Sequence, residues 1–163
     1  MLLSDRRTFL LGGLGALAGC GFSPAYGPQG AATVLQDNIL LDAPKTRSSY
    51  IFVREFETRM GRGEGGKYAL SYSVTFYSDA VSIDKNDTTN RRNLVGTATY
   101  ALRDRDTRKV LTSGKETNFT GYSTSGTTVA SQAARRDAQV RLMTILADQV
   151  IRQLTAAAPN LPK

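Results

Sequence analysis

The sequence of 163 residues contains no histidine, no tryptophan and a single cysteine. Without histidine the chain cannot form a Ser-His-Asp triad, an imidazole general base or a histidine-rich metal site. With one cysteine it can form neither an internal disulfide nor a metal site built on a pair of cysteines. We therefore expect a protein without enzymatic activity, without a cofactor and without a bound metal ion.

Acidic residues are also in short supply. The chain has 21 lysines and arginines against 14 aspartates and glutamates, a formal net charge of +7. An excess of this kind favours an anionic partner, such as nucleic acid, lipid headgroups or a phosphorylated glycolipid. At about 150 residues per domain, the length allows one domain with one modest core.

No hydrophobic run is long enough to suggest a transmembrane helix, which needs about 20 apolar residues. The apolar stretch Phe9–Ala18 follows Arg6 and Arg7, and this pattern is typical of a secretory signal peptide. Residues 4–10 also resemble a twin-arginine signal, so the twin-arginine and the general secretory export routes both stay open.

The one cysteine ends this leader. The run Leu17-Ala18-Gly19-Cys20 resembles the lipobox of bacterial lipoproteins. The resemblance implies that residues 1–19 are a removed signal peptide and that Cys20 is acylated and becomes the first mature residue. Gly21 stands where an aspartate commonly retains such proteins at the inner membrane, which implies a lipid-anchored protein on the periplasmic side of the outer membrane.

The mature chain divides by composition into a tether rich in Gly, Pro and Ala at residues 20–33, one domain at residues 34–158 and a C-terminal tail at residues 159–163. Hydrophobic patterning predicts strands at 38–43, 67–79, 94–103 and 110–122, and helices at 48–60 (capped by Ser48 and Ser49) and 128–157. The order β-α-β-β-β-α predicts an α/β two-layer sandwich, with a mixed sheet of about four strands packed by two helices.

Three connecting segments complete this picture. Residues 61–66 formally match the GxGxxG pattern, but they follow a helix and precede a strand, so we interpret them as a flexible turn. Residues 84–92 are predicted to form a polar loop, and 104–108 a hairpin turn. On the second helix, Asp137–Arg141 and Asp148–Arg152 have the spacing of favourable ion pairs.

Several features together resemble the LptE family of lipopolysaccharide-assembly lipoproteins. They are Cys20-Gly21-Phe22 after the lipobox, the element order, the strand LVGTATYAL at 94–102, and Gly121-Tyr122-Ser123 before a helix rich in Ala, Gln and Arg. The resemblance implies a non-enzymatic outer-membrane lipoprotein. Such a protein plugs and helps to assemble the LptD β-barrel, and it binds lipopolysaccharide (LPS) during delivery to the outer leaflet.

The resemblance also implies ligand-binding cations in the loops after the second and fourth strands. Lys85, Arg91 and Arg92 fit the first of these loops. The second, at 120–126, has no lysine or arginine, so Lys115 or Arg135 would have to substitute. For any single cation, a solvated surface position that only maintains solubility is the competing interpretation.

Other functions compete with this hypothesis. The chain could serve as an auxiliary lipoprotein of another envelope complex, a lipid ABC transporter or a regulator of peptidoglycan synthases. An enzyme would have to rely on a pair such as Asp104 and Asp106, whose spacing is typical of turn chemistry. Nucleic acid is not an expected partner, because export separates the domain from the chromosome and the basic residues lack interleaved aromatic side chains.

Overall fold

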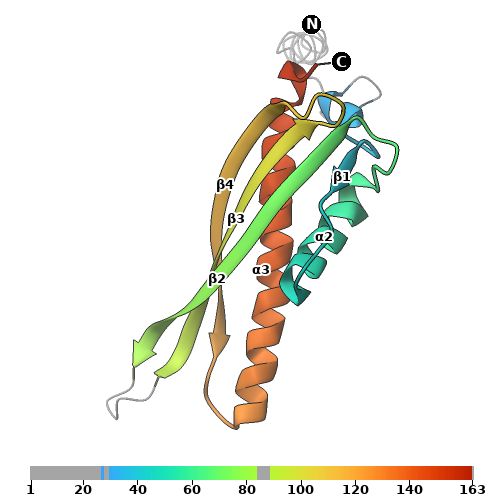
Figure 1. Cartoon of the computed structure of the whole chain (residues 1–163). Coiled ribbons are helices and arrows are strands. Elements are labelled where there is room, and N and C mark those ends of the chain that lie inside the picture. The colour runs from blue at the N-terminus through green and yellow to red at the C-terminus, as the bar shows by residue number, and fades with distance from the viewer. Residues whose placement is uncertain (1–26, 28–29, 84–88, 163) are drawn as a thin grey trace, which may run out of the picture.

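The computed structural model describes residues 27, 30–83 and 89–162. In Figure 1 the long strands lie side by side, with the long C-terminal helix behind them. The elements in chain order are η1 (Ala31–Val34), β1 (Ile39–Leu41), α2 (Arg47–Met60), β2 (Tyr68–Ile83), β3 (Thr89–Asp104), β4 (Val110–Ser123), α3 (Thr128–Ala157) and η2 (Ala158–Asn160).

The four strands form one mixed sheet in the order β1-β2-β3-β4. β1 pairs with β2 in parallel, and the other neighbours pair antiparallel. The predicted α/β two-layer sandwich is therefore confirmed. β2 and β4 run in the same direction, so the loops after them lie at one end of the sheet, which we call the tip. β1 pairs only with the start of β2, so the loop after β1 lies away from the tip. The β3–β4 hairpin lies at the opposite end.

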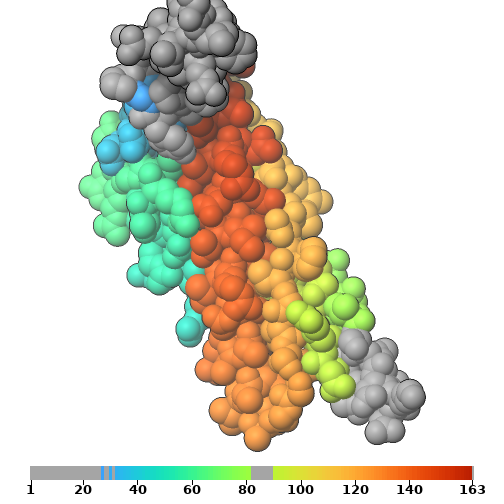
Figure 2. Space-filling view, turned by 180° about the vertical axis from the view of Figure 1, so that it is seen from behind, coloured from blue at the N-terminus to red at the C-terminus, as the bar shows by residue number. Residues whose placement is uncertain are grey.

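Both helices cover the same face of the sheet, and the other face is open. From behind, α3 runs between α2 and the edge strand β4 (Figure 2). Side chains that alternate along the strands, such as Leu94 and Leu102, are fully buried in one core together with Leu142 and Leu146 of α3. The alternation expected for 67–79 is confirmed, since Tyr68 and Leu70 are buried and their odd-numbered neighbours are more exposed.

The prediction of a polar loop at 84–92 is wrong at its C-terminal end. β3 begins at Thr89, so Arg91 and Arg92 lie within a strand. Backbone pairing continues through irregular register to Ile83 and Thr89. Lys85 lies in the connection outside the described residues.

The first helix begins slightly earlier than its sequence indicates. Thr46 is the N-cap, and its side chain accepts a hydrogen bond from the backbone N–H of Ser49. Ser49 therefore occupies the third helical position of a capping box, in which its hydroxyl accepts from the Thr46 N–H at 2.8 Å. Ser48 is buried at the interface with α3, where Gln139 donates a hydrogen bond to its hydroxyl.

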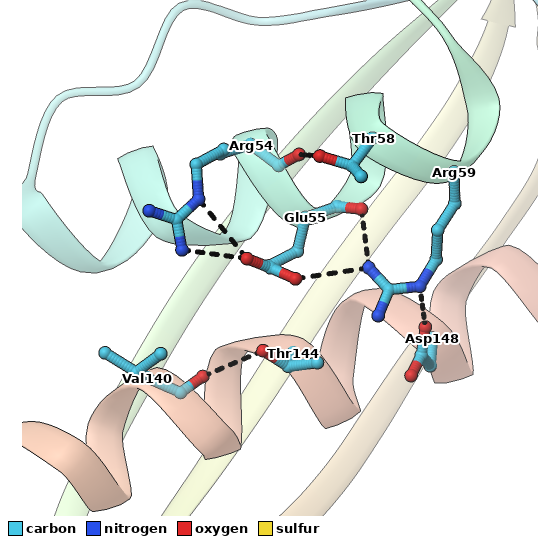
Figure 3. A network of polar contacts seen from close by, with 7 residues as sticks. All are labelled: Arg54, Glu55, Thr58, Arg59, Val140, Thr144 and Asp148. Carbon is cyan, nitrogen blue, oxygen red and sulfur yellow. Dashed lines mark hydrogen bonds and ion pairs between the residues drawn. The ribbon is translucent and has the colours of Figure 1, made fainter.

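Charged side chains join the two helices at the surface (Figure 3). Arg59 of α2 reaches Asp148 of α3 with an Nε–Oδ1 distance of 2.7 Å. Its guanidinium also contacts Glu55, which pairs with Arg54 as well. The expected pair Asp137–Arg141 is present. Asp148, however, pairs with Arg59 rather than with Arg152 in the described structure, because the packing of α2 on α3 brings Arg59 within reach.

The glycine-rich turn after α2 is closely packed. A Cβ on Gly63 would lie 2.3 Å from the backbone nitrogen of Ile39, and one on Gly66 would lie 2.3 Å from the carbonyl oxygen of Asn38. These two glycines let the turn approach the start of β1, while a Cβ on Gly65 would meet nothing within 4 Å. The turn thus has a packing role that its sequence did not reveal.

Ordered structure begins before residue 34. Ala31–Val34 forms the short helix η1, and Ala32 and Leu35 are fully buried. At the other terminus Leu161 is buried, and the Tyr68 hydroxyl donates to the Pro162 carbonyl at 3.0 Å. The end of the predicted tether and Leu161 of the predicted tail therefore pack on the domain. Cys20, the leader and most of the tether lie outside the described residues.

Candidate functional site

The adjacent cations Arg91 and Arg92 lie on opposite faces of the sheet. Successive side chains of a strand alternate, and Arg92 shares the helix-covered face with buried Leu94. Arg91 is exposed, and its guanidinium lies within 4 Å of the position that a Cβ on Gly121 would occupy, on the open face. The two arginines therefore cannot act as one cationic pair.

Arg92 instead meets Arg135 in a groove at the tip. The groove lies between the end of the sheet and the start of α3, and its volume is about 370 Å³. Two arginines from different elements contribute to one site, although they are far apart in the sequence. The lining residues are Ser78, Arg92, Tyr122, Thr124, Thr128, Ser131, Gln132 and Arg135.

Local hydrogen bonds hold the walls of this groove. The Tyr122 hydroxyl lies 3.2 Å from the hydroxyl of Ser78, which connects β4 to β2 on the covered face. The Ser131 hydroxyl donates to the Thr124 carbonyl at 3.1 Å, and this bond fastens the first turn of α3 to the preceding loop. Thr127 caps the helix by accepting from the Ala130 N–H. The groove is thus a fixed feature of the strand-to-helix connection.

The charge of the groove is unbalanced. No carboxylate lines it, whereas Asp42 accompanies Lys45 in a second pocket and Asp104 accompanies Lys109 in a third. Within the described part of the chain, Arg92 and Arg135 make no ion pair. The positive end of the α3 dipole adds to their field. Two guanidinium groups, hydroxyl groups and an amide form an arrangement that suits a phosphorylated, hydroxyl-rich ligand.

Two further predicted cations do not join this groove. Arg91 and Lys115 are on the open face, and Lys115 pairs in register with Thr99. Seven residues of β4 separate Lys115 from Tyr122, which is roughly 24 Å at the rise of an extended strand. Lys85 lies outside the described residues. Of the four predicted ligand-binding residues that the structure describes, only Arg92 and Arg135 are brought together.

The uncharged groove residues were not predicted from the sequence. The sequence contains one usable signal, since alternation along the strand puts Tyr122 on the same face as Thr120. The structure shows that both side chains are buried on the covered face. Thr128, Ser131 and Gln132 lie one helical turn apart on α3, but only the packing of α3 on the sheet determines that they face Arg92.

The aspartate pair that an enzyme would have to use, Asp104 and Asp106, has a structural explanation in the hairpin turn. The Asp104 carboxylate accepts hydrogen bonds from the backbone N–H and the hydroxyl of Thr107, both at 2.8 Å. These bonds hold the pKa of Asp104 below its ordinary value, and they close the predicted hairpin turn. No group of acidic or cysteine side chains in the described ranges could hold a metal ion. Likewise, none of the described helices is long and apolar enough to cross a bilayer.

These features define a small two-layer α/β domain with one basic groove at its tip. The family model described as LptE, lipopolysaccharide-assembly, matches residues 37–154. This match covers more than half of the chain, so the chain belongs to the LptE family of lipopolysaccharide-assembly proteins. No curated protein matches it.

Solved structures share the fold. A Caulobacter crescentus protein described as a lipoprotein has 22% identity and a TM-score of 0.67, with 82% of this chain and 98% of that chain covered. The minor lipoprotein of Acinetobacter baumannii has 22% identity and a TM-score of 0.55, covering 74% and 93%. Rare lipoprotein B of Shewanella oneidensis has 9% identity and a TM-score of 0.58, covering 76% and 96%. At these identities the likeness concerns the fold.

Proposed function

We propose that the chain is an outer-membrane lipoprotein, anchored through acylated Cys20, that plugs and helps to assemble the LptD β-barrel and binds LPS during its delivery to the outer leaflet. Family membership and the lipobox support the envelope role. The groove at the tip supports the binding role. On this proposal the protein has no catalytic step and acts by positioning two partners.

The observation that carries LPS binding is the uncompensated pair Arg92 and Arg135. Guanidinium groups bind phosphate oxygens through paired hydrogen bonds, and these bonds strengthen where no carboxylate competes. The phosphorylated sugar headgroup of LPS would place phosphates between the two arginines and sugar hydroxyls against Ser131 and Gln132. The acyl chains would remain outside this polar groove.

A charge-reversal experiment tests the binding role. Arg92→Glu with Arg135→Glu should weaken binding of purified LPS to the mature protein by about 100-fold, at roughly tenfold per lost charged contact. Arg91→Glu with Lys115→Glu is the matched control, because it makes the same charge change on the open face. It should lower binding only by the general electrostatic effect, about threefold or less. Circular dichroism should show that both variants remain folded.

The comparison of these two variants decides where LPS binds. If both lose affinity equally, net charge rather than the groove controls binding. If only the control variant loses affinity, the ligand-binding surface is the open face. Either result would contradict the groove as the LPS site.

A mild-detergent pull-down of the full chain with mass spectrometry tests the partner. Recovery of a large outer-membrane barrel is expected. Recovery instead of an inner-membrane ATPase complex or a penicillin-binding protein would favour an auxiliary role in another envelope complex. The variant Cys20→Ala should move the protein into the soluble periplasmic fraction unless the barrel retains it, and membrane retention without a barrel would contradict lipidation at Cys20.

A further inference from the structure

The open face of the sheet carries an apolar row across its three long strands. Tyr77, Val95 and Phe119 are direct neighbours in the strand register. Tyr77 is 64% exposed and Phe119 is 59% exposed, so two large aromatic side chains flank Val95 in one exposed apolar row. The core does not use these side chains, because both helices pack on the other face (Figure 1).

Polar residues surround this row. On the side toward the hairpin end, the next register position holds Thr75, Thr97 and Thr117, with the last two hydroxyls 3.1 Å apart. On the side toward the tip lie Asn93 and then Arg91. An aromatic centre with a polar rim is the usual composition of a protein–protein interface.

The shape of this face also favours a protein partner. Three pockets lie at the tip, beside the start of α2 and beside the C-terminus, and these three include none of Tyr77, Val95 and Phe119. Small molecules and single acyl chains bind in concave sites, whereas a flat face buries its area against another flat surface. A second sheet is the natural complement.

A second copy of this chain is a poor complement. By strand alternation, the described strand residues of the open face include the cations Arg91, Arg103 and Lys115 and one carboxylate, Asp79. A twofold dimer would bring the same patch together with itself and would oppose cations to cations. The partner surface should therefore carry excess carboxylate around an apolar contact.

We propose that the open face, centred on the Tyr77–Val95–Phe119 row, docks on the inner wall of the β-barrel partner, at a stretch of wall with acidic side chains. This inference rests on the proposed function, which supplies the barrel. The inner wall of a large barrel is an extended sheet with polar side chains, so it can pair with threonine hydroxyls and with Arg91 and Lys115. The helix-covered side and the groove then remain available to LPS.

Site-specific photo-crosslinking in intact cells tests this orientation. A photo-reactive residue at position 119 should crosslink to the barrel, and one at position 153, where Gln153 is exposed on α3, should crosslink several-fold less. Equal or stronger crosslinking from position 153 would overturn the proposed orientation while leaving the barrel partnership intact. Crosslinks from position 119 to a second copy of the chain, or to LPS, would overturn it as well. Absence of the barrel from the pull-down of the unsubstituted chain would instead contradict the proposed function.

A pair of substitutions measures the contribution of the row. Tyr77→Ser with Phe119→Ser should reduce barrel recovery about tenfold, the effect expected for central aromatic contacts. Tyr50→Ser is the matched control, since Tyr50 is 60% exposed on α2, and it should leave recovery unchanged. LPS binding by the double variant should stay at the unsubstituted level, which separates loss of docking from unfolding. Unchanged barrel recovery by the double variant would overturn the proposal.

Discussion

The two faces of one sheet show how stability and binding are separated in this protein. The same three strands present fully buried Leu70, Leu94 and Leu102 to the helices, and exposed Tyr77 and Phe119 to the outside. Alternation of side chains makes each strand contribute to both faces. The covered face therefore supplies most of the apolar burial, while substitutions on the open face have little effect on the core.

The first and largest expected effect comes from the covered face. Leu146→Ala should lower the free energy of unfolding by about 2–5 kcal/mol, because Leu146 is fully buried and its truncation leaves a cavity. Phe119→Ala removes a larger side chain from the open face and should cost less than about 1 kcal/mol. Urea titrations followed by circular dichroism measure both. A similar loss of unfolding free energy in the two variants would mean that Phe119 stabilises the fold as much as a core residue does.

A smaller difference in stability is expected between alanine substitutions at two glycines, one on each face of the sheet. A Cβ on Gly96 would lie 2.7 Å from Cδ2 of fully buried Leu142, whereas a Cβ on Gly121 would have contacts no closer than 3.6 Å. Gly96→Ala should therefore destabilise by about 1–3 kcal/mol through overpacking. Gly121→Ala should be neutral within about 0.5 kcal/mol. Thermal unfolding of both variants tests this, and equal melting temperatures would contradict tight packing of α3 on β3.

The comparison of faces explains what could be read from the sequence. Alternation in residues 67–79 and the helical period of residues 128–157 identify the strands and helices, because a buried face leaves a periodic pattern. The sequence predicts a loop at Arg91 and Arg92 because the start of β3 is polar on both faces. Backbone hydrogen bonds hold that segment in the sheet, and such bonds do not depend on residue type.

The groove could be predicted only in part, for a related reason. The family resemblance indicates both Arg92 and Arg135 as candidate ligand-binding cations. Their meeting in one groove depends on how α3 crosses the sheet, which Leu142 and Leu146 determine by packing beside Gly96. Arg91 and Arg92 lie on opposite faces because β3 already begins at Thr89. The polar residues around them give no sign of this strand boundary.

Polar contacts on the covered side should contribute less to the free energy of unfolding than apolar contacts do. The Arg59–Asp148 pair joins the helices at the surface, where both side chains are about a third exposed. A double-mutant cycle with Arg59→Ala and Asp148→Ala should give a coupling energy of about 0.2–1 kcal/mol that decreases in high salt. A coupling energy comparable to the cost of Leu146→Ala would contradict this ranking.

The smallest expected effect is a pH dependence at Glu55. The hydrogen bond from Arg54 is the main cause that lowers the pKa of Glu55 from its ordinary value of 4.5; burial opposes it and Arg59 adds to it. Because the pKa is lower in the folded state, Glu55 contributes stability above about pH 4.5, and this contribution is lost as the pH falls through the folded-state pKa. Glu55→Gln should therefore cost a few tenths of a kcal/mol of unfolding free energy at neutral pH. The difference from the unsubstituted protein should vanish once the carboxyl is protonated in both the folded and the unfolded state.

Arg54→Ala should reduce this acid-dependent difference more than Arg59→Ala does, since the hydrogen bond from Arg54 is the larger cause of the lowered pKa of Glu55. Urea titrations at a series of pH values measure these differences, and a cost of Glu55→Gln that stays constant down to about pH 2 would assign it to packing instead of charge.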